Sequence, residues 1–188
     1  MNTQLRIKSH AYSRKSQPHS FLKTQSGESS LGVILLAQNE RGLCAIFLGD
    51  NQASLLEELK VQFPSAKLLQ DQATCRDRVE LLCRYADKPK HNLDLDAHLD
   101  LQGTAFQLRV WQAIKGIPAG QTLSYKEVAK RIQHPNAYRA VAQACSKNMI
   151  ALAIPCHRVI GQNGNLCGYR WGIHRKEILL ESEKHLCI

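Results

Sequence analysis

Apolar positions follow two different spacings along this chain, and its first half contains both. Residues 31–51 hold two apolar runs on either side of a short polar loop with a glycine, which is the pattern of a β-hairpin. Residues 54–63 carry leucines and a phenylalanine at helical spacing before a proline, and a second helical stretch covers about residues 75–86. A polar linker follows at 87–92. The pattern predicts a small α/β unit.

Beyond residue 102 the spacing becomes mainly helical. Residues 103–116 carry an apolar helical stripe, and a Ser-Tyr-Lys-Glu capping box at Ser124 predicts a helix that ends near Ile132. Pro135 suits the first position of a further helix over 136–147, because its missing N–H costs nothing there. Two short helices joined by a tight turn indicate a helix-turn-helix, although many such pairs never touch DNA.

The second helix of this pair has an outer face suited to close approach. Arg139, Ala142, Gln143 and Ser146 lie at i, i+3, i+4 and i+7, so they share one side. A helix that discriminates between base edges usually carries several long polar side chains. This face has one arginine among small residues. We expect it to lie close against a groove with little sequence readout.

Composition sets the class of protein. Hydrophobic residues make up 44% of the 188 residues and charged residues 22%, which excludes a long disordered polymer. No apolar run approaches the ~20 residues of a membrane-spanning helix, and the N-terminus has no hydrophobic signal segment. We therefore expect a soluble cytoplasmic protein without membrane contact.

Charge is divided unevenly, and the division outlines three expected parts. Residues 1–27 hold five basic residues and no acidic residue, and we interpret them as a flexible basic tail. Residues 28–102, the expected α/β domain, carry a net charge of −4, whereas residues 103–188 carry +8. A basic part favours contact with a polyanion such as nucleic acid, although a solvated basic face has the same composition.

The seven cysteines include no C-x-x-C pair. An odd count in a chain without an export signal indicates a reducing compartment. Cys145, Cys156 and Cys167 recur every eleven residues, which is not the spacing of a metal site, and nothing in the sequence calls for a cofactor. Most of these cysteines are expected to be small buried hydrophobic residues.

Cys156 needs a different account. It follows Pro155 on a rigid turn and is flanked by His157 and Arg158, surroundings that lower the pKa of a thiol. A helix over about 173–183 places Glu177 on a partly apolar face, as a lip residue or a buried partner for a histidine. Cysteine, histidine and glutamate from separate segments predict an activated nucleophile, with a structural buried cysteine as the alternative.

Five motifs in combination resemble one protein family. IPCHRVIG, SYKEVA, RAV, GYRWGIHRKEILL and GTAF-x-x-x-VW together resemble the O6-alkylguanine-DNA alkyltransferases over about residues 30–183. The pattern is most similar to the C-terminal half of the bacterial adaptive-response methyltransferases. The resemblance implies a ribonuclease H-like N-terminal unit and a mostly helical DNA-binding, alkyl-accepting domain. The zinc-binding and transcription-activating domains of those proteins are not in this chain, so we expect a stand-alone repair protein.

The resemblance also implies a reaction. Cys156 would take the alkyl group from guanine O6 in a single displacement, and the protein would react once. His157 would accept the thiol proton through a water, Glu177 would orient that histidine, and Tyr125 would hydrogen-bond or protonate guanine N3. O4-alkylthymine is a second expected lesion.

Other residues would hold the DNA. Arg139 would fill the gap left by a flipped nucleotide, and Asn148 would brace the turn between the outer helix and an active-site strand. Val159, Tyr169 and Arg170 would recognise the extruded base. Further DNA contacts are expected from Lys126, Ala140 and Ala142. The expected partner is double-stranded DNA that contains O6-alkylguanine, bound by a protein that is monomeric in its absence.

Three alternatives have different expectations. A non-enzymatic protein that binds alkylated guanine would lack the reactive cysteine, and Cys156 is present. A helix-turn-helix regulator would need base-reading side chains, in which the outer helix is poor. A Cys-His hydrolase would turn over repeatedly and would place its base across a cleft.

Overall fold

The computed structural model describes residues 10–11, 21–89, 93, 95 and 98–186. These residues divide into two compact units. The first contains residues 10–11, 21–87, 95 and 98–103, and the second contains residues 88, 89, 93 and 104–186.

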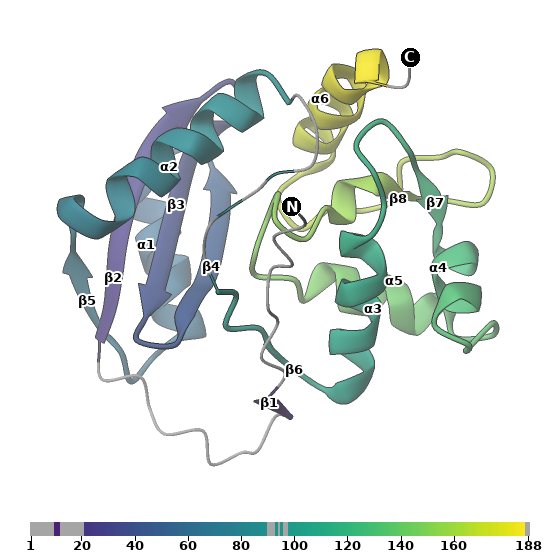
Figure 1. Ribbon diagram of the computed structural model, residues 1–188, viewed down its shortest axis with the longest axis horizontal. Coiled ribbons are helices and arrows are strands. Elements are labelled where there is room, and N and C mark those ends of the chain that lie inside the picture. Colours follow the sequence, from purple (N-terminus) through teal and green to yellow (C-terminus); the bar gives the residue numbers. More distant parts are fainter. Residues whose placement is uncertain (1–9, 12–20, 90–92, 94, 96–97, 187–188) are drawn as a thin grey trace, which may run out of the picture. The chain divides into compact units, whose positions relative to one another are not determined.

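The first unit is built around a four-stranded sheet in the order β4-β3-β2-β5 (Figure 1). Its strands and helices are β2 (Phe21–Ser29), β3 (Gly32–Asn39), β4 (Gly42–Gly49), α1 (Gln52–Gln62), β5 (Lys67–Gln70) and α2 (Gln72–Asp87). The strand β3 pairs antiparallel with β2 and β4, which confirms the predicted hairpin, and β5 runs parallel to β2. The two helices lie on opposite faces of the sheet (Figure 1). Both faces are therefore covered, which explains why consecutive residues of β3, from Ile34 to Ala37, are all buried.

The hairpin loop requires its glycine. Gly42 has φ of 143°, and a Cβ atom there would lie 2.3 Å from the carbonyl oxygen of His98. The same carbonyl accepts a hydrogen bond from the Leu43 N–H at 2.8 Å. A side chain at position 42 would therefore displace the segment that leads toward the second unit.

The predicted flexible tail over residues 1–27 extends too far along the chain, because its last residues are part of the sheet. Residues 21–27 belong to β2, a strand that is paired on both sides, and Leu22 and Thr24 are buried. The polar composition of this segment hid a strand whose backbone pairing and alternate side chains hold it in the sheet. Residues 10–11 form β1 (His10–Ala11), which pairs with β6 (Gln102–Gly103). The rest of the predicted tail lies outside the described residues.

The second unit is mostly helical. Its elements are α3 (Ala105–Lys115), β7 (Leu123–Ser124), α4 (Tyr125–Arg131), α5 (Tyr138–Ser146), the 3₁₀ turn η1 (Cys156–Arg158), β8 (Val159–Ile160), α6 (Ile173–Glu183) and η2 (Lys184–Leu186). Complete capping boxes start α3 at Thr104 and α4 at Ser124, the second as predicted. The indole N–H of Trp111 donates to the Ala144 carbonyl at 2.9 Å, which fastens α3 to α5.

One local prediction in this unit is wrong. The helix α5 begins at Tyr138, after a turn in which the Ala137 N–H donates to the His134 carbonyl at 2.9 Å, so Pro135 is not its first residue. The apolar run before Cys156 bends through turns, with Leu152 at φ of 64°, while residues 150–154 stay buried. The surrounding core buries this segment whatever its backbone conformation, so its apolar composition does not specify a strand.

Among the helices that the structure describes, none has the length and apolar character needed to cross a membrane.

Candidate active site

The turns that precede η1 hold Cys156 in place, and Asn148 braces them. Asn148 is buried, and its Oδ1 accepts from the Ile150 N–H at 2.9 Å. Its Nδ2 donates to the Ile154 carbonyl at 3.0 Å and to Cys156 Sγ at 3.3 Å. The predicted bracing role agrees with this geometry, although the braced segment is a series of turns.

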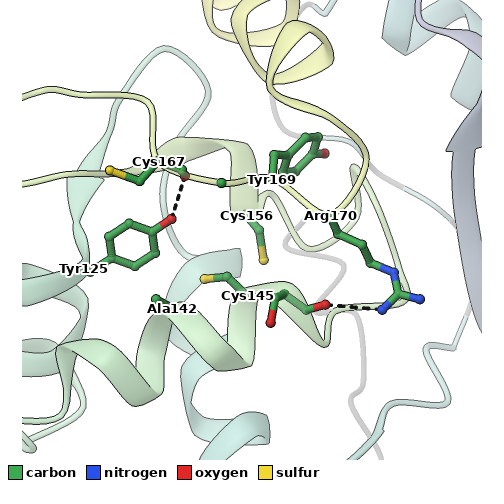
Figure 2. A pocket seen from close by; sticks show the side chains of 9 residues that line it. Tyr125, Ala142, Cys145, Cys156, Cys167, Tyr169 and Arg170 are labelled. Carbon is green, nitrogen blue, oxygen red and sulfur yellow. Dashed lines mark hydrogen bonds between the residues drawn. The ribbon is translucent and has the colours of Figure 1, made fainter.

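Cys156 lies in a pocket of about 320 Å³ within the second unit (Figure 2). Residues from the start of α4, from α5, from η1 and from the loop before α6 line the pocket: Tyr125, Ala142, Cys145, Ser146, Cys156, Cys167, Gly168, Tyr169 and Arg170. Five predicted site residues, Tyr125, Ala142, Cys156, Tyr169 and Arg170, are therefore brought together from four segments.

Behind the cysteine, His157 is bound by Glu183 and not by Glu177, so the predicted partner is wrong. Nε2 of His157 lies 3.0 Å from Oε1 of Glu183, and both side chains are buried. Glu177 is exposed. The buried side of α6 carries Lys176, Leu179 and Glu183, at i, i+3 and i+7, which turns Glu177 toward solvent.

Arg158 completes this buried network. Its Nε donates to Oε2 of Glu183 at 2.9 Å and its Nη2 donates to Oε1 at 2.8 Å, a bidentate pair. Its Nη1 donates to the Ile117 carbonyl at 2.6 Å. Burial by itself would raise the pKa of Glu183, but the hydrogen bonds from His157 and Arg158 lower it to about 2.

These contacts define the protonation state of His157. Burial lowers the pKa of His157 despite the neighbouring carboxylate, so the imidazole is neutral at pH 7. An ionised carboxylate only accepts hydrogen bonds, so Nε2 carries the imidazole proton and Nδ1 carries a lone pair. Nδ1 is buried without a hydrogen-bond partner among the described residues. The lone pair of Nδ1 is therefore not engaged by a donor of the described residues.

The thiol of Cys156 is not activated by its sequence neighbours. Its contact with the Cys145 thiol and its burial raise the pKa of Cys156 well above the ordinary value, although Asn148 and Lys176 act in the other direction. The predicted lowering by His157 and Arg158 is wrong, because one is neutral and the other is paired with Glu183. The resting side chain is a thiol, so any attack by Cys156 requires transfer of its proton.

Lys176 is a site residue that the sequence analysis missed. Its side chain is buried, and Nζ donates to the Val159 carbonyl at 2.6 Å and to the Cys167 carbonyl at 3.2 Å. The Tyr125 hydroxyl donates to that same Cys167 carbonyl at 3.1 Å (Figure 2). The sequence contained one indication of this role, because Lys176 is a charged residue on the apolar face of the predicted last helix. Val159 is buried and is not among the residues that line the pocket.

The remaining predicted DNA-binding residues lie outside the pocket. Arg139 is exposed near the start of α5, with Cζ 5.7 Å from the centre of the Tyr138 ring. Ala140 is half-buried on the same helix, and exposed Lys126 lines a separate polar hollow of about 470 Å³. Gln143 and Ser146 are also exposed, whereas Val141, Ala144 and Cys145 face the core, as the spacing predicts.

Arg170 ties the loop before α6 to α5. Its Nη1 donates to the Ser146 carbonyl at 3.2 Å (Figure 2). Its guanidinium carbon lies 5.0 Å from the centre of the Trp171 ring. Tyr169, which precedes Arg170 in the sequence, contacts His157 edge to face, with ring centroids 6.4 Å apart. The loop therefore connects the pocket wall with the buried histidine. The described residues contain no cluster of three or more His, Cys, Asp or Glu side chains able to hold a metal ion.

Comparison with known proteins agrees with this combination of an α/β unit and a helical unit with a buried cysteine. Residues 22–85 match the family described as 6-O-methylguanine DNA methyltransferase, ribonuclease-like domain. Residues 105–185 match the family described as 6-O-methylguanine DNA methyltransferase, DNA binding domain.

Individual relatives extend the match over most of the chain. The methylated-DNA–protein-cysteine methyltransferase of Methanosarcina mazei is 42% identical over 159 residues, which are 84% of this chain and 94% of that protein. The bifunctional transcriptional activator/DNA repair enzyme Ada of Escherichia coli is 45% identical over 156 residues, which are 83% of this chain. This chain spans less than half of that relative and of the regulatory protein ada of Salmonella typhimurium, 44% and 42% of their lengths.

A solved structure has a similar fold. Mycobacterium tuberculosis OGT in complex with DNA is 34% identical, has a TM-score of 0.70, and is matched over 87% of this chain and 94% of that one. The chain belongs to the 6-O-methylguanine DNA methyltransferase family, as the sequence motifs predict.

Proposed function

We propose that this chain repairs alkylated DNA by moving the alkyl group from guanine O6 to Cys156, once per molecule. Relatives that this chain matches over 94% of their own length are named methylated-DNA–protein-cysteine methyltransferases, and a related structure is a DNA complex. The observation that carries the proposal is the arrangement at the pocket, where Cys156 precedes a neutral histidine held by a buried carboxylate.

The reaction begins with proton transfer. The thiol proton of Cys156 passes through a water to Nδ1 of His157, the nitrogen without a partner. Glu183 takes the role that the sequence assigned to Glu177, because it binds Nε2 and stabilises the imidazolium that forms. The resulting thiolate attacks the alkyl carbon.

The displacement moves the alkyl group from guanine O6 to sulfur. A bond forms between Cys156 Sγ and the alkyl carbon while the bond from that carbon to O6 breaks, and the electron pair goes to guanine. Burial raises the pKa of Tyr125, so its hydroxyl stays protonated and can donate to guanine N3 as charge develops. The proton lost by the thiol ends on guanine, which leaves neutral. O4-alkylthymine offers the same type of bond.

Access to the base requires nucleotide flipping, because the target atom lies inside the duplex stack. The outer face of α5 presents Arg139 among small residues, an arrangement suited to the minor groove with one side chain inserted for the missing base. Lys126 and Ala140 would contact the DNA around it, and Ala142 would form the pocket wall beside α5. Repair in any sequence context needs such contacts without base readout.

The loop before α6 would hold the flipped base. Tyr169 and Arg170 line the pocket, and their backbone would bind the base edge. The Val159 carbonyl already accepts from Lys176, but a carbonyl oxygen has a second lone pair for the base amino group. Lys176 would thus position the recognition groups without touching the reacting atoms.

Intact-protein mass spectrometry tests the proposal. Incubation with an O6-methylguanine duplex should add one methyl group per chain, saturate at one equivalent and leave Cys156→Ser unchanged. Tight binding to the duplex without a mass gain would instead indicate a protein that only binds the lesion. If the protein neither binds the duplex nor gains mass, the result would favour a helix-turn-helix regulator.

A further inference from the structure

The three cysteines at eleven-residue spacing converge on the pocket. Cys145 projects from α5, Cys156 from η1 and Cys167 from the loop before α6 (Figure 2). Figure 2 shows the sulfur atoms of Cys145 and Cys156 pointing toward each other in the pocket that both residues line. Cys167 is exposed, and its Sγ contacts the Asn165 carbonyl oxygen at 3.6 Å, away from the other two. The transfer reaction uses only one of these thiols.

We propose that Cys145 is the resolving partner of Cys156, so that oxidation closes the pair into a reversible disulfide. The bond would form without DNA and therefore goes beyond the proposed repair reaction. Its consequence for repair rests on that proposed function, because a Cys156 held in a disulfide cannot accept an alkyl group.

Hydroperoxides are the class of oxidant that this chemistry needs. Once the thiol proton has passed to His157, the Cys156 thiolate attacks one peroxide oxygen and the O–O bond breaks. A Cys156 sulfenic acid and hydroxide form, and the hydroxide takes up that proton as water. The Cys145 sulfur then attacks the Cys156 sulfur, the S–O bond breaks, and water leaves with the Cys145 proton. Overall two thiols lose two hydrogen atoms, and one hydrogen peroxide becomes two water molecules.

The local structure suits this closure. Asn148 contacts both partners: its N–H donates to the Cys145 carbonyl at 3.2 Å, and its side chain donates to Cys156 Sγ at 3.3 Å. Cys145 is the penultimate residue of α5, where a small displacement disturbs few helical hydrogen bonds. Both thiols line a pocket large enough to admit hydrogen peroxide.

A disulfide between Cys145 and Cys156 would protect Cys156 from irreversible oxidation. A sulfenic acid that meets no thiol goes on to sulfinic acid, which does not return to a thiol under ordinary reductants. Capture by Cys145 keeps Cys156 in a form that thiol reductants reverse. The expected signature is therefore loss of alkyl acceptance with peroxide and its recovery with dithiothreitol.

Trypsin separates the three cysteines, which makes the test direct. Cleavage after Arg139, Lys147, Arg158 and Arg170 places Cys145, Cys156 and Cys167 on peptides 140–147, 148–158 and 159–170. Full-length protein treated with hydrogen peroxide and then alkylated should yield peptide 140–147 joined to 148–158, and the intact chain should lose two hydrogen masses. The same samples are assayed with an O6-methylguanine duplex before and after dithiothreitol.

Three variants, each compared with its own untreated activity, decide the outcome. Cys145→Ser should lose the recovery and accumulate sulfinic acid on Cys156, whereas Cys167→Ser and Cys83→Ser, in the other unit, should keep it. The proposal is overturned if Cys156 links to Cys167 or another cysteine, or if Cys145→Ser recovers as fully as the parent. If the protein forms the disulfide under peroxide but its reduced form does not accept a methyl group from the duplex, the repair function is refuted and the disulfide proposal is not.

Discussion

Glu183 Oε1 lies 3.0 Å from Nε2 of His157, and the two side chains meet inside the protein although 26 residues separate them. This contact determines which nitrogen of His157 carries the imidazole proton. It assigns the imidazole proton to Nε2, leaves Nδ1 as the acceptor and places the compensating negative charge behind the histidine. Arg158 and the Gly120 N–H donate to the same carboxylate, so His157 shares the charge of Glu183 with other donors.

Replacing Glu183 by Gln should impair both chemistry and folding. The amide no longer fixes the histidine tautomer, so the rate of methyl transfer is expected to fall by about 10²-fold or more. An uncompensated buried Arg158 should cost about 3–5 kcal/mol of unfolding free energy. Single-turnover kinetics and urea unfolding measure the two effects. Glu177→Gln is the matched control from the same helix, and equal losses in the two variants would contradict the assignment.

Stability should fall as the solution becomes acidic, in two steps. The pKa of His157 is lowered below its ordinary 6.5, so below that pH the unfolded chain gains a proton that the folded chain does not. The pKa of Glu183 is lowered from 4.5 to about 2, so its contribution is present above 4.5 and is lost between these values, up to about 3 kcal/mol.

Thermal unfolding between pH 8 and about pH 2 measures this dependence. Glu183→Gln should remove most of the lower step. An unchanged lower step in that variant would show that other carboxylates cause it.

Lys176→Met should loosen the pocket wall. The variant leaves the Val159 and Cys167 carbonyls without their buried donor, so the loop that contacts Tyr125 should shift. Misplacement of groups around the base is expected to slow reaction with free O6-benzylguanine by about ten- to a hundredfold. The exposed Lys184→Met serves as control. A variant with parental kinetics would exclude the positioning role.

Arg139→Ala should separate duplex repair from reaction with a free base. Arg139 is exposed on α5 and does not line the pocket, so its loss should slow repair of duplex DNA by about tenfold or more, equivalent to ~1.4 kcal/mol. Reaction with free O6-benzylguanine should change little. Arg109→Ala, an exposed arginine on α3, controls for charge. Equal losses with both substrates would remove the proposed insertion role.

DNA affinity should depend steeply on salt. Residues 103–188 carry a net charge of +8, and each phosphate that a basic side chain neutralises contributes about 0.9 to the slope of log affinity against log salt. Fluorescence anisotropy with a labelled duplex measures this slope. A flat profile would argue against binding through phosphate contacts.

Local sequence determined much of this protein. The capping box at Ser124, the hairpin around Gly42 and the inward and outward faces of α5 follow from interactions within a few residues, and the structure contains all three. Five short motifs in combination, one of them around Cys156, likewise identified the family. These features need no knowledge of distant contacts.

Tertiary structure decided the rest. Residues 21–27 form a strand because β3 and β5 pair with them, and Glu183 replaces Glu177 because the packed side of α6 selects which carboxylate is buried. The raised pKa of Cys156 arises from burial and from Cys145, not from its neighbours in sequence. Pairing, burial and electrostatic environment depend on segments that only folding brings together, so they are not readable from local spacing.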